Sequence, residues 1–188
     1  MRRVILAGLL GGLALFAWES VAHLLLPLGQ AGIKTIDNEQ AVVASLRDNV
    51  KQSGLYFFPA AAATGTAQAG GPTGILAFQP VGTMSIMPSQ LLTQLGADIV
   101  AMIVAGILLA QAGGFPGFGK RVLFFTLMGI LPALRTDLSY WNWYAFPTVY
   151  TAAQFTVNIV GFCLAGFVLA RIIATPASAP LRKGHASA

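Results

Sequence analysis

Four long apolar stretches dominate the pattern of hydrophobic and polar positions along the chain. They run from Val4 to Leu26, from about Leu91 to Ala112, from Val122 to about Leu138, and from about Val149 to Ile173. The first has 23 residues, which at helical rise cover roughly 34 Å and suffice for a bilayer core of about 30 Å. The third is the shortest span that we expect, about 25 Å long with a kink at Pro132. The pattern predicts an all-α membrane protein with four transmembrane helices.

The segment between the first two spans, residues 27–87, is long enough to carry secondary structure of its own. Asp37 or Asn38 is expected to cap an amphipathic helix that continues to about Gln52. Two strand-like runs follow and would pair as a hairpin: Leu55–Phe58 and Gly74–Phe78. A two-stranded sheet is marginally stable by itself, so we expect a small α+β cap that docks on the ends of the helices.

Charged residues are scarce. They make up 9% of the chain, where a soluble domain carries about 25%. Hydrophobic residues reach 56%, and the mean hydropathy is +0.72. This composition excludes a soluble enzyme, a disordered chain and a nucleic-acid-binding module. The formal net charge of +5 comes from basic residues beside apolar runs, which is typical of membrane flanks rather than of a nucleic-acid surface.

The distribution of basic residues predicts how the chain is oriented. With the N-terminus in the cytoplasm, the inner segments hold seven basic and no acidic residues: Arg2, Arg3, Lys120, Arg121, Arg171, Arg182 and Lys183. The positive-inside rule therefore favours both termini in the cytoplasm. Residues 1–26 then form the first transmembrane helix, 27–87 an extracytoplasmic cap, 88–173 the other three helices, and 174–188 a disordered cytoplasmic tail. The aromatic residues around Trp141 form a belt at the outer interface.

A cleaved signal peptide is a competing interpretation of the N-terminus. A pair of arginines, the apolar stretch Val4–Ala17 and the small residues near Ala22 mimic the three regions of such a peptide. Glu19 is unusual so near a cleavage site, however, and the apolar run continues to Leu26. These two features favour a membrane span.

Strongly polar side chains within the spans are the candidate functional residues, because ionisable groups in a bilayer cost free energy where they have no partner. Counted along the helices, Glu19 and Asp98 both lie about 10 Å from the outer boundary, and His23 stands one turn above Glu19. The whole set lies in the outer half: Glu19, His23, Asp98, Arg135, Gln154 and Asn158. These residues either join the helices, with Arg135 paired to Glu19 or Asp98, or line a polar cavity for a small ligand, a lipid headgroup, a proton or a metal.

The inner half of the spans is apolar and rich in small residues. Gly8 and Gly12 form a GxxxG motif, which is typical of closely packed transmembrane helices. Further small residues recur one turn apart on two other spans: Ala97, Ala101 and Ala105, and Gly161 with Ala165.

The sequence offers little support for an enzyme or a cofactor. Glu19, His23 and Asp98 are chemically acceptable metal ligands but weak candidates, because no motif such as HExxH accompanies them. Haem held by two histidines is disfavoured, since the second histidine, His185, falls in the tail on the opposite side. Cys163 is the single cysteine, which excludes a disulfide framework. We therefore expect no cofactor and no catalytic residue.

Four short stretches stand out from the rest of the chain: Trp18-Glu19 with His23, the Leu26–Gly29 exit followed by Ala31-Gly32-Ile33, Leu55–Pro59, and Tyr140–Tyr144 before Phe146-Pro147. In these stretches the chain resembles a group of small bacterial four-span inner-membrane proteins with no known activity. The resemblance implies a bacterial inner-membrane setting and transfers no catalytic residue. We expect an accessory or structural membrane protein with membrane lipid as a partner, in a homo-oligomer or a larger membrane complex, and with no nucleic acid. The alternative is a ligand-binding or transport protein with a polar cavity in the outer half of the bilayer.

Overall fold

The computed structural model describes residues 1–61, 65–66, 70–81, 87–113 and 115–173. Within these ranges, four helical segments are long and apolar enough to cross a membrane: α1 (Arg2–Leu24), α3 (Pro88–Gln111), Phe118–Tyr144 and α6 (Thr148–Ile172). All four carry large apolar side chains that are exposed, among them Leu13, Val100, Leu131 and Phe167. The helices are those of a multi-pass membrane protein, as the hydrophobic pattern predicts. The tail expected at 174–188 lies outside the described residues.

The third apolar helix is longer than the sequence pattern suggested. It consists of α4 (Phe118–Pro132), the π-helical segment η2 (Ala133–Asp137) and α5 (Leu138–Tyr144), 27 residues in all. The expectation of the shortest span was therefore wrong. Beyond Pro132 the Leu138 amide bonds to the Ala133 carbonyl, an i to i+5 pattern that carries the helix on past the proline instead of ending it.

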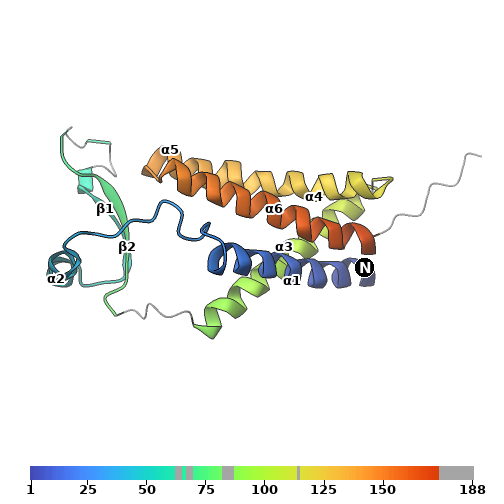
Figure 1. Cartoon of the computed structure of the whole chain (residues 1–188), viewed down its shortest axis with the longest axis horizontal. Helices are drawn as coiled ribbons and strands as arrows, with labels where there is room; N and C mark the ends of the chain where they lie inside the picture. Colours follow the sequence, from blue (N-terminus) through green and yellow to red (C-terminus); the bar gives the residue numbers. More distant parts are fainter. Residues whose placement is uncertain (62–64, 67–69, 82–86, 114, 174–188) are drawn as a thin grey trace, which may run out of the picture. The chain divides into compact units, whose positions relative to one another are not determined.

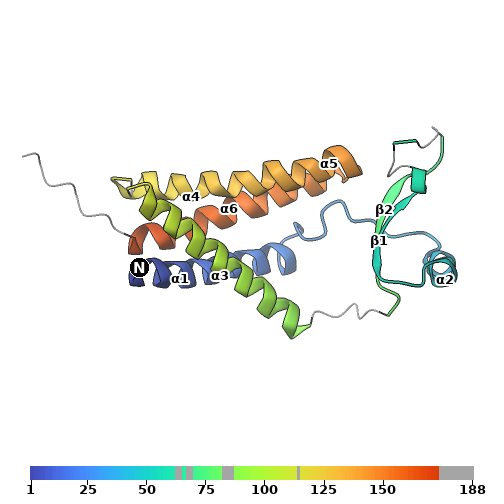
Figure 2. The ribbon, with the colours of Figure 1, turned by 180° about the vertical axis from the view of Figure 1, so that it is seen from behind.

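The chain divides into two compact units, and the first is made of long helices. It comprises Met1–Glu19, Gln94–Gly129 and the chain from Ile159 onward. Its largest fully buried side chains are Phe125, Met102, Leu109 and Leu169. The alternate view in Figure 2 shows how α3 crosses α1 within this unit.

The two glycines of the GxxxG motif lie where α1 meets α3. A Cβ atom at Gly12 would stand 2.5 Å from the Cα of Ile99, and one at Gly8 would stand 2.8 Å from the Cα of Ile103. Both distances are to backbone atoms, so any larger residue would push the helices apart. The small-residue pattern thus marks a genuine close approach of two helix backbones.

The second unit comprises Ser20–Thr93 and Ile130–Asn158 and holds the smaller elements. Helix α2 (Glu39–Asn49) begins after Asn38, whose side chain accepts a hydrogen bond from the Ala41 amide at 3.3 Å, so the predicted cap is confirmed. Strands β1 (Gly54–Phe58) and β2 (Gly74–Phe78) pair antiparallel, as the strand-like runs predicted. Figure 1 labels these elements along the chain.

Two glycines shape the segment that follows α1. Gly29 packs on the last turn of α1, where an added Cβ would lie 2.8 Å from the Cα of His23. Gly32 has a φ of 78°, and a Cβ added to it would lie 2.9 Å from a methyl carbon of Val149 at the start of α6. A residue with a side chain would be both strained and crowded at Gly32.

Candidate functional site

A glutamine joins the two carboxylates that the sequence places at one depth. The Nε2 atom of Gln94 donates one hydrogen bond to Oε2 of Glu19 at 3.0 Å and another to Oδ1 of Asp98 at 2.9 Å. Gln94 and Asp98 are one turn apart on α3, and Glu19 belongs to α1. An amide nitrogen carries two hydrogens, so both are directed at carboxylates. We call Glu19, Gln94 and Asp98 the carboxylate cluster.

The second oxygen of Asp98 is the unusual atom of this cluster. Asp98 is 4% exposed, and its Oδ2 atom is buried with no hydrogen-bond partner among the residues that the structure describes. A buried acceptor without a partner costs about 1–3 kcal/mol, and more when it is charged. Such an atom is therefore a strong acceptor for a proton or a cation.

The glycine contact between α1 and α3 positions the cluster. Asp98 directly precedes Ile99, the residue against which Gly12 packs. On α1, Glu19 follows Gly12 by seven residues, or about two helical turns, so the two project from the same side of the helix. The close approach of the backbones thus brings Glu19 within hydrogen-bonding distance of α3.

The other candidates occupy different places. His23 and Arg135 are exposed, and Gln154 is half-buried. Asn158 donates a hydrogen bond from Nδ2 to Oδ2 of Asp137 at 2.9 Å. The pairing of Arg135 with Glu19 or Asp98 stays a prediction.

No metal centre is visible in the part of the chain that the structure describes. No three histidine, cysteine, aspartate or glutamate side chains there are arranged to hold a metal ion. The weak metal candidates Glu19, His23 and Asp98 therefore do not form a three-ligand site.

Two residues of structural weight were not among the sequence candidates. Gln94 could have been found by extending the polar pattern one turn outward from Asp98. Arg121 was expected to flank the membrane, and its side chain is buried there against the ends of two helices. Its Nε donates to the Ala170 carbonyl and its Nη1 to the Phe115 carbonyl, both at 3.2 Å. The first of these carbonyls lies in the last turn of α6, where carbonyl groups have no partner within the helix.

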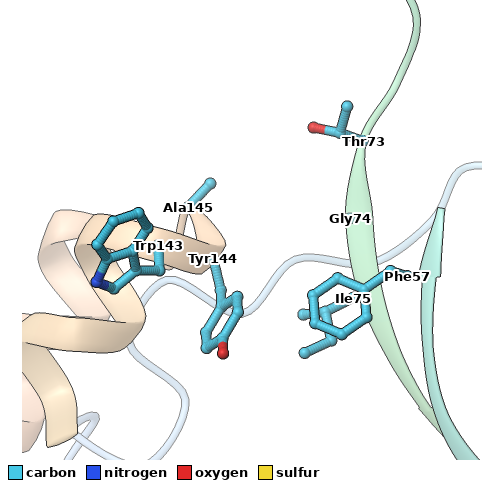
Figure 3. A pocket seen from close by; sticks show the side chains of 7 residues that line it. All are labelled: Phe57, Thr73, Gly74, Ile75, Trp143, Tyr144 and Ala145. Carbon is cyan, nitrogen blue, oxygen red and sulfur yellow. The ribbon is translucent and has the colours of Figure 1, made fainter. Parts of the chain in front are cut away.

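A separate pocket lies in the second unit, between the sheet and the end of α5. Its volume is about 450 Å³, and Figure 3 shows Trp143 and Tyr144 on one side with Phe57 and Ile75 of the sheet on the other. The rings of Phe57 and Tyr144 are 5.9 Å apart. The αL conformation of Ala145 ends α5 at the pocket edge.

Comparison of the chain with protein families, with curated proteins and with solved structures found no match. The function of the chain is therefore inferred from the geometry of the carboxylate cluster and of the pocket between the sheet and α5, which we call the aromatic pocket.

Proposed function

We propose that this chain is a multi-pass membrane protein that binds a proton or a small monovalent cation at the carboxylate cluster. One observation carries this proposal: the buried Oδ2 atom of Asp98 has no hydrogen-bond partner among the described residues. Ionisable groups are rare on transmembrane segments, and where they occur they often mark a binding site or a pathway for an ion or a proton. A proton or cation at Oδ2 would give this atom the partner that it lacks among the described residues.

The hydrogen bonds of Gln94 support this assignment. The carboxylates of Glu19 and Asp98 both accept hydrogen bonds from the same atom, Nε2 of Gln94, so the two acidic groups lie close together. Two carboxylates at such close range repel when both are ionised. Binding of one positive charge removes most of that repulsion, and an apolar bilayer strengthens the effect because it screens charge poorly.

A second function has its own supporting observation. The hydrogen bond from Gln94 to Glu19 joins α3 to α1 at 3.0 Å, as expected if the cluster only holds helices together. In that case the protein is an accessory or structural membrane component without enzymatic activity, working in a homo-oligomer or a larger complex.

The proposed setting is the bacterial inner membrane, with both termini in the cytoplasm and α2, β1 and β2 in an extracytoplasmic cap. The support is the excess of basic residues in the segments assigned to the inside. Under this orientation the carboxylate cluster lies in the outer half of the bilayer.

Infrared difference spectroscopy on the purified protein in nanodiscs tests the proton site. Protonation of a buried carboxylate produces a carboxylic C=O band, and we expect a pH step to produce such a band in the wild type and to lose it in Asp98→Asn. Asp137→Asn is the matched control, because Asp137 is also a helical carboxylate but already accepts a hydrogen bond from Asn158. If protons give no band, titration with Na⁺, K⁺ and Li⁺ tests the cation by the rise in Tm.

Stability separates the two functions. A binding site predicts that Asp98→Asn unfolds at or above the wild-type Tm, because the change removes the charge from a buried carboxylate whose Oδ2 atom has no hydrogen-bond partner among the described residues. A purely structural cluster predicts a lower Tm for Asp98→Asn. Absence of both the infrared band and any cation response in the wild type would refute the binding site.

A further inference from the structure

A hollow with a basic residue lies on one face of η2 and α5. Its volume is about 460 Å³, and its lining residues are Arg135, Thr136, Ser139, Tyr140, Trp143 and Tyr144. They form two adjacent rows with a spacing of four residues, 135–139–143 and 136–140–144, which lie on one side of the helix. They comprise one cation, three hydroxyl-bearing side chains other than Tyr144, and two aromatic residues at the far end, with no acidic side chain.

The acidic residue of η2, Asp137, has its hydrogen-bond partner on α6. Asp137 is two residues from Arg135, and its carboxylate accepts the hydrogen bond from Asn158 on α6. Ser139 donates its hydroxyl hydrogen to the Arg135 carbonyl at 2.8 Å, which fixes this turn of the helix. The positive charge of Arg135 at the hollow is therefore not offset by a carboxylate from its own helix.

The hollow adjoins the aromatic pocket of Figure 3. Trp143 and Tyr144 line both, and beyond them the pocket continues to Phe57 and Ile75. Trp143 is 76% exposed, although tryptophan has a large apolar side chain that is usually mostly buried. A cationic, hydroxyl-rich hollow beside an apolar pocket matches a molecule with an anionic group at one end and hydrocarbon next to it.

We propose that the hollow and the pocket together bind an anionic phospholipid. The phosphate lies against Arg135 and the hydroxyls of Thr136 and Tyr140, because guanidinium binds phosphate oxygens with paired, charge-assisted hydrogen bonds. The glycerol and the first methylene groups pack on Trp143 and Tyr144. Tryptophan and tyrosine favour the level of lipid headgroups, and four helices of the chain are long and apolar enough to cross a membrane. This site is independent of the carboxylate cluster.

Lipid titration of the full-length protein, followed by native mass spectrometry, tests the assignment. Phosphatidylglycerol and phosphatidylcholine with identical acyl chains are compared. We expect the wild type to prefer phosphatidylglycerol about tenfold, or about 1.4 kcal/mol, because the choline cation of phosphatidylcholine offsets its phosphate and is repelled by Arg135. Arg135→Gln should lose this preference. Arg135→Lys keeps the charge and should retain part of the preference. Arg47→Gln, an equal loss of charge at an exposed position on α2, should retain all of it.

A second variant tests the apolar half of the site. Trp143→Ala should weaken binding of both lipids, while its Tm without added lipid should stay near the wild-type value because the side chain is exposed. An unchanged preference in Arg135→Gln would overturn the assignment. So would displacement of phosphatidylglycerol by equimolar inorganic phosphate, which would identify a site for the free anion. Unaltered lipid binding in Trp143→Ala would equally overturn it, because headgroup charge alone would then explain the preference.

Discussion

Replacement of Gly12 by alanine is the sharpest test of how α1 and α3 pack. The added methyl carbon would stand 2.5 Å from the Cα and 2.7 Å from the N atom of Ile99, whereas carbon atoms in contact lie about 3.5–4.0 Å apart. Both atoms belong to the backbone, so rotation of a side chain cannot relieve the overlap. The two helices must therefore separate by about 1 Å at this point.

The size of the effect follows from two opposing terms. Forcing extra volume into a packed contact costs about 1–3 kcal/mol, and alanine is favoured over glycine within a helix by about 1 kcal/mol. We expect Gly12→Ala to lower the free energy of unfolding by about 1 kcal/mol, and by at most about 2 kcal/mol. Gly96→Ala on α3 is the matched control, because a Cβ there meets nothing within 4 Å. It should raise the free energy of unfolding by up to about 1 kcal/mol.

Reversible unfolding in mixed micelles with increasing dodecyl sulfate, followed by tryptophan fluorescence, measures both variants against the wild type. Opposite signs for the two glycines would support the contact. A Gly12→Ala protein as stable as Gly96→Ala would refute the reasoning, because it would mean that α1 and α3 have room for a methyl group between them.

Three further predictions concern other parts of the chain. Arg121→Gln should lower the free energy of unfolding by about 2–3 kcal/mol, because hydrogen bonds from a charged group to two carbonyls are lost. The control is Lys120→Gln at an exposed neighbouring position, which should change the free energy of unfolding little in the same dodecyl sulfate titration. Asn38→Ala should destabilise α2 by about 1 kcal/mol, seen as faster hydrogen exchange of the Ala41 amide, and unchanged exchange there would show that the cap is not formed in solution. A reporter active only in the cytoplasm should work when fused after Lys120 and fail when inserted near Ala67; activity at the second position would reverse the proposed orientation.

The sequence predicted the four apolar helices and the small elements because each depends on a short-range pattern. Asn38 marks the start of α2 through a hydrogen bond only three residues long, and the strands β1 and β2 follow from compact apolar runs. The third span was expected to pass Pro132 with a kink and to end at about Leu138, and its further length to Tyr144 could not be predicted in this way. A proline in a helical pattern predicts a kink, and only the structure shows the π-helical hydrogen bond from the Leu138 amide to the Ala133 carbonyl.

The candidate site was predictable in part. Counting residues along two spans brought Glu19 and Asp98 to one depth, because helical rise is constant. Gln94 was missed, since an exposed glutamine near a helix start resembles any other polar residue at a boundary. The burial of Arg121 could not be predicted either, because a basic pair beside an apolar run predicts only a membrane flank, and the partner of Arg121 is a carbonyl group at the end of α6.

The contact at Gly12 and the acceptor at Asp98 should also be coupled, because Ile99 connects them. If Gly12→Ala separates α1 from α3, water gains access to the cluster and the Oδ2 atom of Asp98 is no longer dry. Asp98→Asn should then stabilise the Gly12→Ala protein less than it stabilises the wild type. A double-mutant cycle in the same titration should give a coupling of about 0.5 kcal/mol or more, as residues in contact do. Additive effects would mean that the contact between α1 and α3 does not exclude water from the Asp98 carboxylate. The destabilisation caused by the Asp98 charge would then have a cause other than this helix contact.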